Sequence, residues 1–188
     1  MLSVWGCPRH DGMTGWSVLT MKESFLPVED EKARVLLLGS LPGDASLSLA
    51  EYYGHPRNAF WPIMGELLGF SPQLPYEARL NFLKLRGIAL WDVVSRAYRR
   101  GSLDSDIREA EPNDIPALLR RCPGIVRIGC NGGAAYTLLK KFYPELFRNE
   151  VWEIVRLPST SPAAAMISYS AKRDAYASFL KELIGETE

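Results

Sequence analysis

The chain has 188 residues, 47% of them hydrophobic and 23% charged, and its 22 basic side chains balance 22 acidic ones. This is the composition of a globular protein, and no apolar run approaches the roughly 20 residues that a membrane-spanning helix needs. A net charge of zero argues against indiscriminate coating of nucleic acid. It still allows a small enzyme that touches a few phosphates through a local basic patch.

The length suits one domain with a full core. Residues 1–20 differ from the rest, because they are small and polar without a sustained period. We expect them to be either a poorly ordered extension or an arm packed through Trp5 and Trp16, with residues 21–188 forming a single domain. The N-terminus shows no secretory signal, so we expect a cytoplasmic protein.

Metal and cofactor chemistry find little support in the sequence. Cys7, Cys122 and Cys130 are widely spaced and form no Cys-x-x-Cys pair, which argues against structural zinc and an iron–sulfur cluster. A phosphate-binding Gly-x-x-x-x-Gly-Lys-Ser/Thr loop is absent from the sequence, which argues against a phosphotransferase. We therefore expect no metal and no organic cofactor.

Short apolar runs alternate with amphipathic stretches along the chain. Four runs read as strands buried on both faces: 35–39, 88–91, 125–129 and 154–157. Helical spacing of apolar residues predicts helices over three stretches: 60–68, ended by Gly69, then 134–142 and 175–183. This alternation predicts a three-layer α/β/α fold with a central four-stranded, mainly parallel sheet.

Ligands of such sheets bind at the carboxyl ends of the strands. The segment after the first predicted strand, Gly39-Ser40-Leu41-Pro42-Gly43, forces a sharp turn and leaves backbone N–H groups at that edge. Such groups hold an anion or a carbonyl oxygen, although a plain β-turn would have the same sequence.

The segment 52–61 concentrates aromatic rings, a histidine, an arginine and an amide just before a predicted helix. Tyr53 suits a flat wall on which a base stacks. Phe60 and Trp61, at the start of the helix, either join that wall or seal the core.

These two segments together resemble the mismatch-specific branch of the uracil-DNA glycosylase superfamily, and the variant here is similar to the deoxyinosine (hypoxanthine) DNA glycosylases. The Pro158-Ser159 loop after the last strand matches the superfamily's other signature. The resemblance implies a monofunctional base excision repair enzyme. Such an enzyme flips a deaminated base, with hypoxanthine expected and uracil or xanthine as alternatives, and hydrolyses its N-glycosidic bond. The expected partner is damaged DNA, and we expect a monomer.

Two positions depart from the related branches. Leu41 precedes the proline of the turn, where those branches place a residue that orients or activates the attacking water. Leu157 opens the late loop, where several of them place His or Asn. Either another residue acts, or the protein is not a glycosylase.

Three residues are candidates for catalysis: Asn58, Asp44 and His55. The amide of Asn58 can orient a water through its oxygen and bond the base through its N–H₂ group. Asp44 is the alternative acid–base group, unless it only caps a helix. His55 either donates a proton near neutral pH or bonds backbone.

Further residues are candidates for contacts with the flipped base: Ser40, Leu41, Gly43, Tyr53, Phe60 and Asn131. Asn131 follows the third predicted strand, where it either reads the base edge or caps a helix.

On the DNA side, Arg57 meets a phosphate or is a solvated surface arginine. The hydroxyl-rich residues Ser159, Thr160 and Ser161 would pinch the DNA backbone by resemblance. Small residues from Ala163 onward would then fill the gap left by the flipped nucleotide, with Met166 as the bulky wedge. The basic stretch 96–102 contacts the DNA backbone or is solvated surface.

Two competing functions remain at the level of sequence. One is a nucleic-acid-binding module of the same fold without catalysis, which Leu41 and Leu157 favour. The other is a hydrolase of free nucleosides, which would need neither Arg57 nor the Pro158-Ser159 loop. No lysine occurs in the three motif segments, so a Schiff-base lyase step is not indicated.

Overall fold

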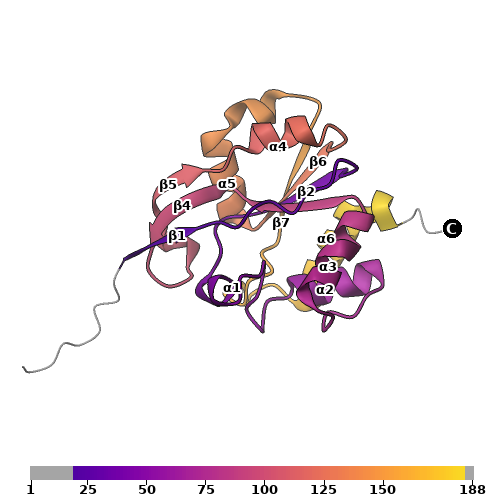
Figure 1. Ribbon diagram of the computed structural model, residues 1–188, viewed down its shortest axis with the longest axis horizontal. Coiled ribbons are helices and arrows are strands. Elements are labelled where there is room, and N and C mark those ends of the chain that lie inside the picture. Colours follow the sequence, from indigo (N-terminus) through magenta and orange to yellow (C-terminus); the bar gives the residue numbers. More distant parts are fainter. Residues whose placement is uncertain (1–18, 185–188) are drawn as a thin grey trace, which may run out of the picture.

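The computed structural model describes residues 19–184 (Figure 1). Expectations about residues 1–18 lie outside the described residues, whereas Thr20 already belongs to the first strand. The first half of the chain forms β1 (Thr20–Glu23), β2 (Val35–Gly39), α1 (Asp44–Leu49), α2 (Phe60–Leu68), α3 (Tyr76–Leu85), β3 (Ile88–Asp92) and β4 (Val94–Arg99). The second half forms η1 (Asp104–Asp106), β5 (Arg108–Pro112), α4 (Ile115–Arg121), β6 (Arg127–Asn131), α5 (Gly133–Phe142), η2 (Pro144–Arg148), β7 (Glu153–Leu157) and α6 (Tyr169–Ile184).

The main sheet has four strands in the order β3-β2-β6-β7, all parallel. All five residues of β2 and of β3 are buried, as the continuous apolar runs predicted. In Figure 1, α4 and α5 lie on one side of this sheet, and α2, α3 and α6 lie on the other. The predicted three-layer α/β/α fold with a four-stranded parallel sheet is therefore confirmed.

The predicted helix over 60–68 is also confirmed. Phe60, Ile63 and Met64 of α2 are fully buried, and Gly69 ends the helix at a φ of 76°, in the left-handed region that glycine tolerates best. Cys122 and Cys130 are buried free thiols.

One strand is displaced from its predicted position, by two residues. The apolar pair Ile125 and Val126 belongs to the turn before the strand, and the strand itself runs from Arg127 to Asn131. Asn131 therefore ends the strand instead of following it, and its side chain lies at the edge of the sheet.

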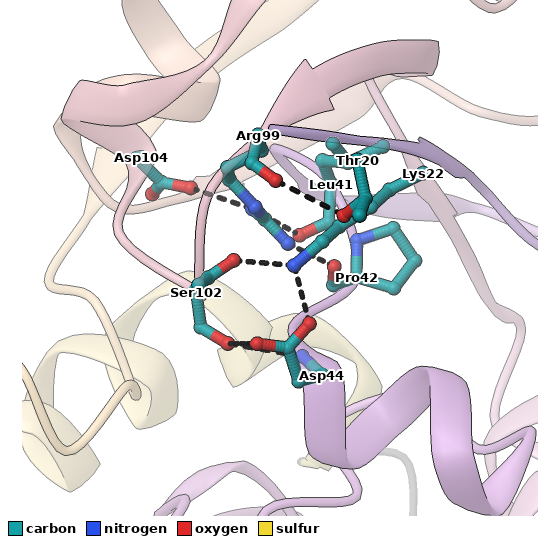
Figure 2. Close-up of polar contacts among 9 residues, drawn as sticks. Thr20, Lys22, Leu41, Pro42, Asp44, Arg99, Ser102 and Asp104 are labelled. Carbon is teal, nitrogen blue, oxygen red and sulfur yellow. Dashed lines mark hydrogen bonds and ion pairs between the residues drawn. The ribbon is translucent and has the colours of Figure 1, made fainter. Parts of the chain in front are cut away.

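A second sheet, antiparallel and with the strand order β1-β4-β5, was not predicted. Its strands carry a polar, irregular pattern: β5 reads Arg-Glu-Ala-Glu-Pro, and its pairing with β4 shifts register twice. This sheet matters for the site, because β4 ends at Arg99 and delivers the following loop beside the turn after β2 (Figure 2).

Among the described residues, no helix combines the length and the apolar character needed to cross a bilayer. Within residues 19–184, no group of three or more His, Cys, Asp or Glu side chains is arranged to hold a metal ion.

Candidate base-binding site

A cavity of about 310 Å³ opens at the carboxyl ends of the parallel strands, where the fold rule places ligands. Its walls come from four segments: 39–46, 52–58, 102–104 and 159–163. Asp92 and Asn131, which end β3 and β6, complete the lining. This volume lies at the small end of the range for ligand pockets.

Most of the predicted site residues meet in this cavity. Those that line it are Asn58, His55, Ser40, Leu41, Gly43, Tyr53, Asn131, Ser159, Thr160, Ser161 and Ala163. Four others are not part of the lining: Asp44, Phe60, Arg57 and Met166. Leu41 lines the cavity but packs mainly in a small apolar cluster with Val94 and Ala97.

Asp92 forms a buried acidic group in the wall of the cavity. Its side chain is only 4% exposed, and its Oδ2 accepts a hydrogen bond from Ser24 Oγ at 3.1 Å. Gly39 makes room for the carboxyl group, because a Cβ atom at that position would lie 2.3 Å from Asp92 Oδ1. Burial raises the pKa of Asp92 to about 7, so this group holds a proton over part of the neutral range.

Tyr53 and Phe60 build the aromatic wall. Their rings stack with centroids 3.9 Å apart, and Phe60 is fully buried, so it backs Tyr53 instead of facing the cavity. Tyr53 adopts a left-handed φ of 56°, which a bulky side chain rarely takes. Its buried hydroxyl finds no hydrogen-bond partner among the described residues. Burial and the nearby Asp92 raise the pKa of Tyr53, so the phenol remains a donor.

Asn58 and His55 are fixed by the backbone at the entrance to α2. Asn58 Oδ1 accepts a hydrogen bond from the N–H of Phe60 at 3.0 Å, and His55 Nδ1 accepts one from the N–H of Arg57 at 3.0 Å. The contact of Asn58 leaves its Nδ2 and the second lone pair of Oδ1 for a ligand, and the contact of His55 leaves Nε2. His55 thus makes the backbone contact that was one of its two expected roles.

The amide of Asn131 ties the late loop to the sheet. Its Nδ2 donates to Thr160 Oγ1 at 2.9 Å, and its Oδ1 accepts from the N–H of Thr160 at 2.9 Å. One amide hydrogen and one lone pair remain for a base. The alternative of a helix cap is wrong, because Gly132 is the residue that precedes α5.

Asp44 is engaged outside the cavity. Lys22 donates to its carboxylate, and Ser102 Oγ accepts from its N–H at 2.9 Å (Figure 2). The hydrogen bond from Lys22 lowers the pKa of Asp44, which makes it a poorer base. The cap interpretation is wrong too, because Gly43 holds the cap position and Asp44 is the first residue of α1.

The buried side chain of Arg99 binds the backbone of the turn after β2. Although it lies in the basic stretch expected at the surface, its side chain is fully buried, so both interpretations of that stretch are wrong for this residue. Its guanidinium donates to the carbonyl oxygens of Leu41, at 3.2 Å, and of Pro42 (Figure 2). Arg96 and Arg100 of the same stretch are exposed.

The DNA-side candidates outside the cavity are exposed: Arg57 lies at the surface, and Met166 is 99% exposed on the loop before α6. Two acidic residues of the cavity were not predicted from the sequence. Asp92 directly follows a predicted strand, so the rule of carboxyl ends could have found it. Asp104 lies in the loop of the second sheet, and no sequence pattern pointed to it.

A parallel α/β sheet with an aromatic-walled, polar cavity at its strand ends is suited to binding a flat polar ring. Comparison with known proteins is consistent with this. The profile of the Uracil DNA glycosylase superfamily matches residues 26–184. The chain therefore belongs to the uracil DNA glycosylase superfamily.

Three individual proteins of known name are similar to this chain. A hypoxanthine DNA glycosylase from Methanosarcina barkeri is 41% identical over 112 residues, which are 59% of this chain and 71% of that protein. One from Methanosarcina acetivorans is 40% identical over 144 residues, covering 76% of this chain and 88% of that protein. A solution NMR structure of a protein from Methanosarcina acetivorans, provisionally named uracil DNA glycosylase, superposes with a TM-score of 0.75 at 35% identity. It covers 87% of this chain and 99% of that one.

Proposed function

We propose that the protein is a monofunctional DNA glycosylase that flips a deaminated base, with hypoxanthine as the main substrate, and hydrolyses its N-glycosidic bond. The main observation in support of this function is that three motif segments line one cavity: 39–43, 52–58 and 159–163. Uracil and xanthine share the flat ring and the carbonyl edge of hypoxanthine, so they are secondary candidates.

The base enters the cavity beside Tyr53 and stacks on its ring, which Phe60 holds in place. Ser40, Gly43 and the remaining hydrogen-bonding capacity of Asn131 lie around the ring edge. Cleavage gives the sugar oxocarbenium character, so a water must be positioned at C1′. Asn58, whose amide is fixed by the N–H of Phe60, is the residue that orients this water.

Departure of the base requires a proton for the ring. Asp92 supplies it, because its pKa of about 7 keeps a substantial fraction of the carboxyl groups protonated at neutral pH. His55 Nε2 is the second candidate donor, since Nδ1 is already engaged. Neither role needs a metal or an organic cofactor.

Contacts with the DNA backbone fall to the exposed rim. Ser159 and Ser161 pinch the strand, Arg57 meets a phosphate, and Ala163 and Met166 fill the space that the nucleotide leaves. Thr160, which was expected beside them, is only 1% exposed and bonds Asn131, so it positions the loop instead of touching DNA. A DNA substrate requires the protein to work where the chromosome lies, which in a prokaryote is the nucleoid. We expect a monomer.

The test is base release from duplex oligonucleotides carrying one deoxyinosine, deoxyuridine or deoxyxanthosine, read as alkali-labile strand breaks. Free deoxyinosine nucleoside is a parallel substrate. In Asn58→Ala the single-turnover rate on deoxyinosine should fall by about 10²- to 10³-fold, a typical loss for a group that positions the reacting water.

Each other outcome is informative. Release that survives Asn58→Ala would keep the enzyme but remove this residue from the chemistry. Cleavage of free nucleoside in preference to DNA would indicate a nucleoside hydrolase. Binding of damaged DNA without release of any base would contradict the glycosylase assignment and leave a binding module.

A further inference from the structure

Hydrolysis needs an acceptor for the proton of the attacking water, and the amide of Asn58 cannot take one. Asp44 does not reach the cavity, and Leu41 has no proton-accepting group. Among the described residues, two carboxyl groups line the cavity: Asp92 and Asp104.

These two carboxyl groups lie at different depths. Asp92 is 4% exposed at the end of β3, whereas the side chain of Asp104 is 41% exposed at the start of η1. A flipped base enters first and deepest, and the sugar to which it is attached stays at the mouth. The deep group therefore faces the base, and the exposed group faces the level of C1′ and of incoming water.

Asp104 is held in this position by two contacts. Ser40 Oγ donates to its Oδ1 at 2.6 Å. Arg99 Nη1 lies 3.6 Å from the same oxygen (Figure 2). Because both contacts engage Oδ1, Oδ2 is the oxygen available to a water. Ser40 belongs to the turn after β2, and Arg99 binds two carbonyl groups of that turn. The carboxylate is thus fixed to the segment that lines the cavity.

We propose that Asp104 is the general base of this site, oriented by Ser40 and Arg99. The proposal rests on the glycosylase function. In the step, the water oxygen bonds C1′ as the bond from C1′ to the ring nitrogen breaks. The electron pair of that bond leaves with the base, which takes a proton from Asp92 or solvent, and one proton of the water passes to Asp104.

The environment of Asp104 suits this role. Partial burial raises the pKa of Asp104, which strengthens the carboxylate as an acceptor. The nearby guanidinium of Arg99 opposes that shift and keeps a charged form accessible.

The test compares wild type, Asp104→Ala and Asp104→Asn in single-turnover base release from a deoxyinosine duplex. Both variants should lose about 10²- to 10³-fold in rate, with binding of an uncleavable duplex unchanged. Added formate should restore part of the rate in Asp104→Ala but not in Asp104→Asn, since only the alanine leaves space for a replacement carboxylate. Asp106→Asn, two residues along the same turn and outside the lining, should behave as wild type.

If Asp104→Ala folds poorly, Ser40→Ala provides a second test. It removes the hydroxyl that orients Asp104 and should lower the single-turnover rate by about tenfold, in line with the loss of one orienting hydrogen bond. Because Ser40 also lies at the edge of the base, binding of an uncleavable duplex is measured alongside, and a rate loss with unchanged binding separates the two roles. Wild-type rates in both Asp104→Asn and Ser40→Ala, or a loss in Asp104→Ala that formate leaves unchanged, would overturn the proposal while the glycosylase function stands. A wild type that releases no base would instead overturn the function itself.

Discussion

Asp92 and Gly39 occupy one small volume, where the end of β3 meets the end of β2. The carboxyl group fits because residue 39 has no side chain, and it is neutralised by its own burial and not by a cation. A buried carboxyl group destabilises the folded state strongly when it is ionised and only weakly when it is protonated. The protonation state of Asp92 therefore affects both the chemistry of the site and the free energy of unfolding.

This makes the free energy of unfolding depend on pH in a definite direction. The pKa of Asp92 rises from 3.8 to about 7 on folding, so the folded state retains a proton that the unfolded chain loses. Stability from this group is fully present below pH 3.8 and is lost as pH rises through about 7. The unfolding free energy lost in this way amounts to about 4 kcal/mol, since each pKa unit corresponds to about 1.4 kcal/mol.

Asp92→Asn should remove that dependence, since the amide stays neutral. The difference in unfolding free energy between variant and wild type, measured by urea denaturation, should shift in favour of the variant between pH 5 and pH 8. A difference that is constant with pH would show that Asp92 titrates normally. Base release by the wild type should also decline as pH rises through about 7, because Asp92 loses the proton that it gives to the base. Asp92→Asn has no such proton and should release base slowly, with no decline over that range.

At the scale of elements, the second sheet acts as a clamp on the first. The end of β4 and the loop that follows it bind the segment after β2. Arg99 donates to the carbonyl groups of Leu41 and Pro42, and Ser102 accepts from the N–H of Asp44 (Figure 2). Asp104 accepts from Ser40. Backbone carbonyls that are buried with a charged donor are expensive to leave without a partner.

Arg99→Met therefore tests the clamp. It keeps much of the volume but leaves the two carbonyl groups without their donor, and the unfolding free energy should fall by about 2–4 kcal/mol. The matched control is Arg96→Met on the same strand. Arg96 is 51% exposed in a surface ion pair with Glu111, and its loss should change the unfolding free energy far less than the loss of Arg99. Equal effects of the two substitutions would contradict the clamp.

The elements of the main sheet and one of its covering helices could be predicted from the sequence. Buried parallel strands and amphipathic helices leave strong periodic patterns, so β2, β3 and α2 could be predicted almost to the residue. The turn after β2, the segment before α2 and the loop after β7 each carry recognisable residues, and most of the predicted site followed from them.

The rest could not be predicted, for physical reasons. The pairing of β4 with β5 is irregular and β5 is largely exposed, so neither strand shows clean alternation. Without that sheet, nothing indicated that Arg99 is buried or that Asp104 reaches the cavity. The Lys22–Asp44 pair joins residues far apart in the chain, and only the folded structure shows that it removes Asp44 from the site.

At the scale of the whole molecule, the cavity is built where two sheets meet, with a deep acidic group, an aromatic wall and a carboxylate at the mouth. A chain of zero net charge holds no general attraction for DNA, so recognition depends on the local rim and on what the cavity accepts. Extrusion of the nucleotide is easiest where pairing is already weakened, as at a deaminated base.

The central claim is that water, delivered in this cavity, replaces a deaminated base in DNA. The most direct measurement is a single-turnover reaction on a deoxyinosine duplex, with the products analysed by mass spectrometry and a parallel sample treated with borohydride. We expect free hypoxanthine, an abasic strand that stays uncut until alkali is added, and no trapped protein–DNA adduct. An unchanged deoxyinosine strand, a strand cut without alkali or a trapped covalent adduct would contradict hydrolysis by this site.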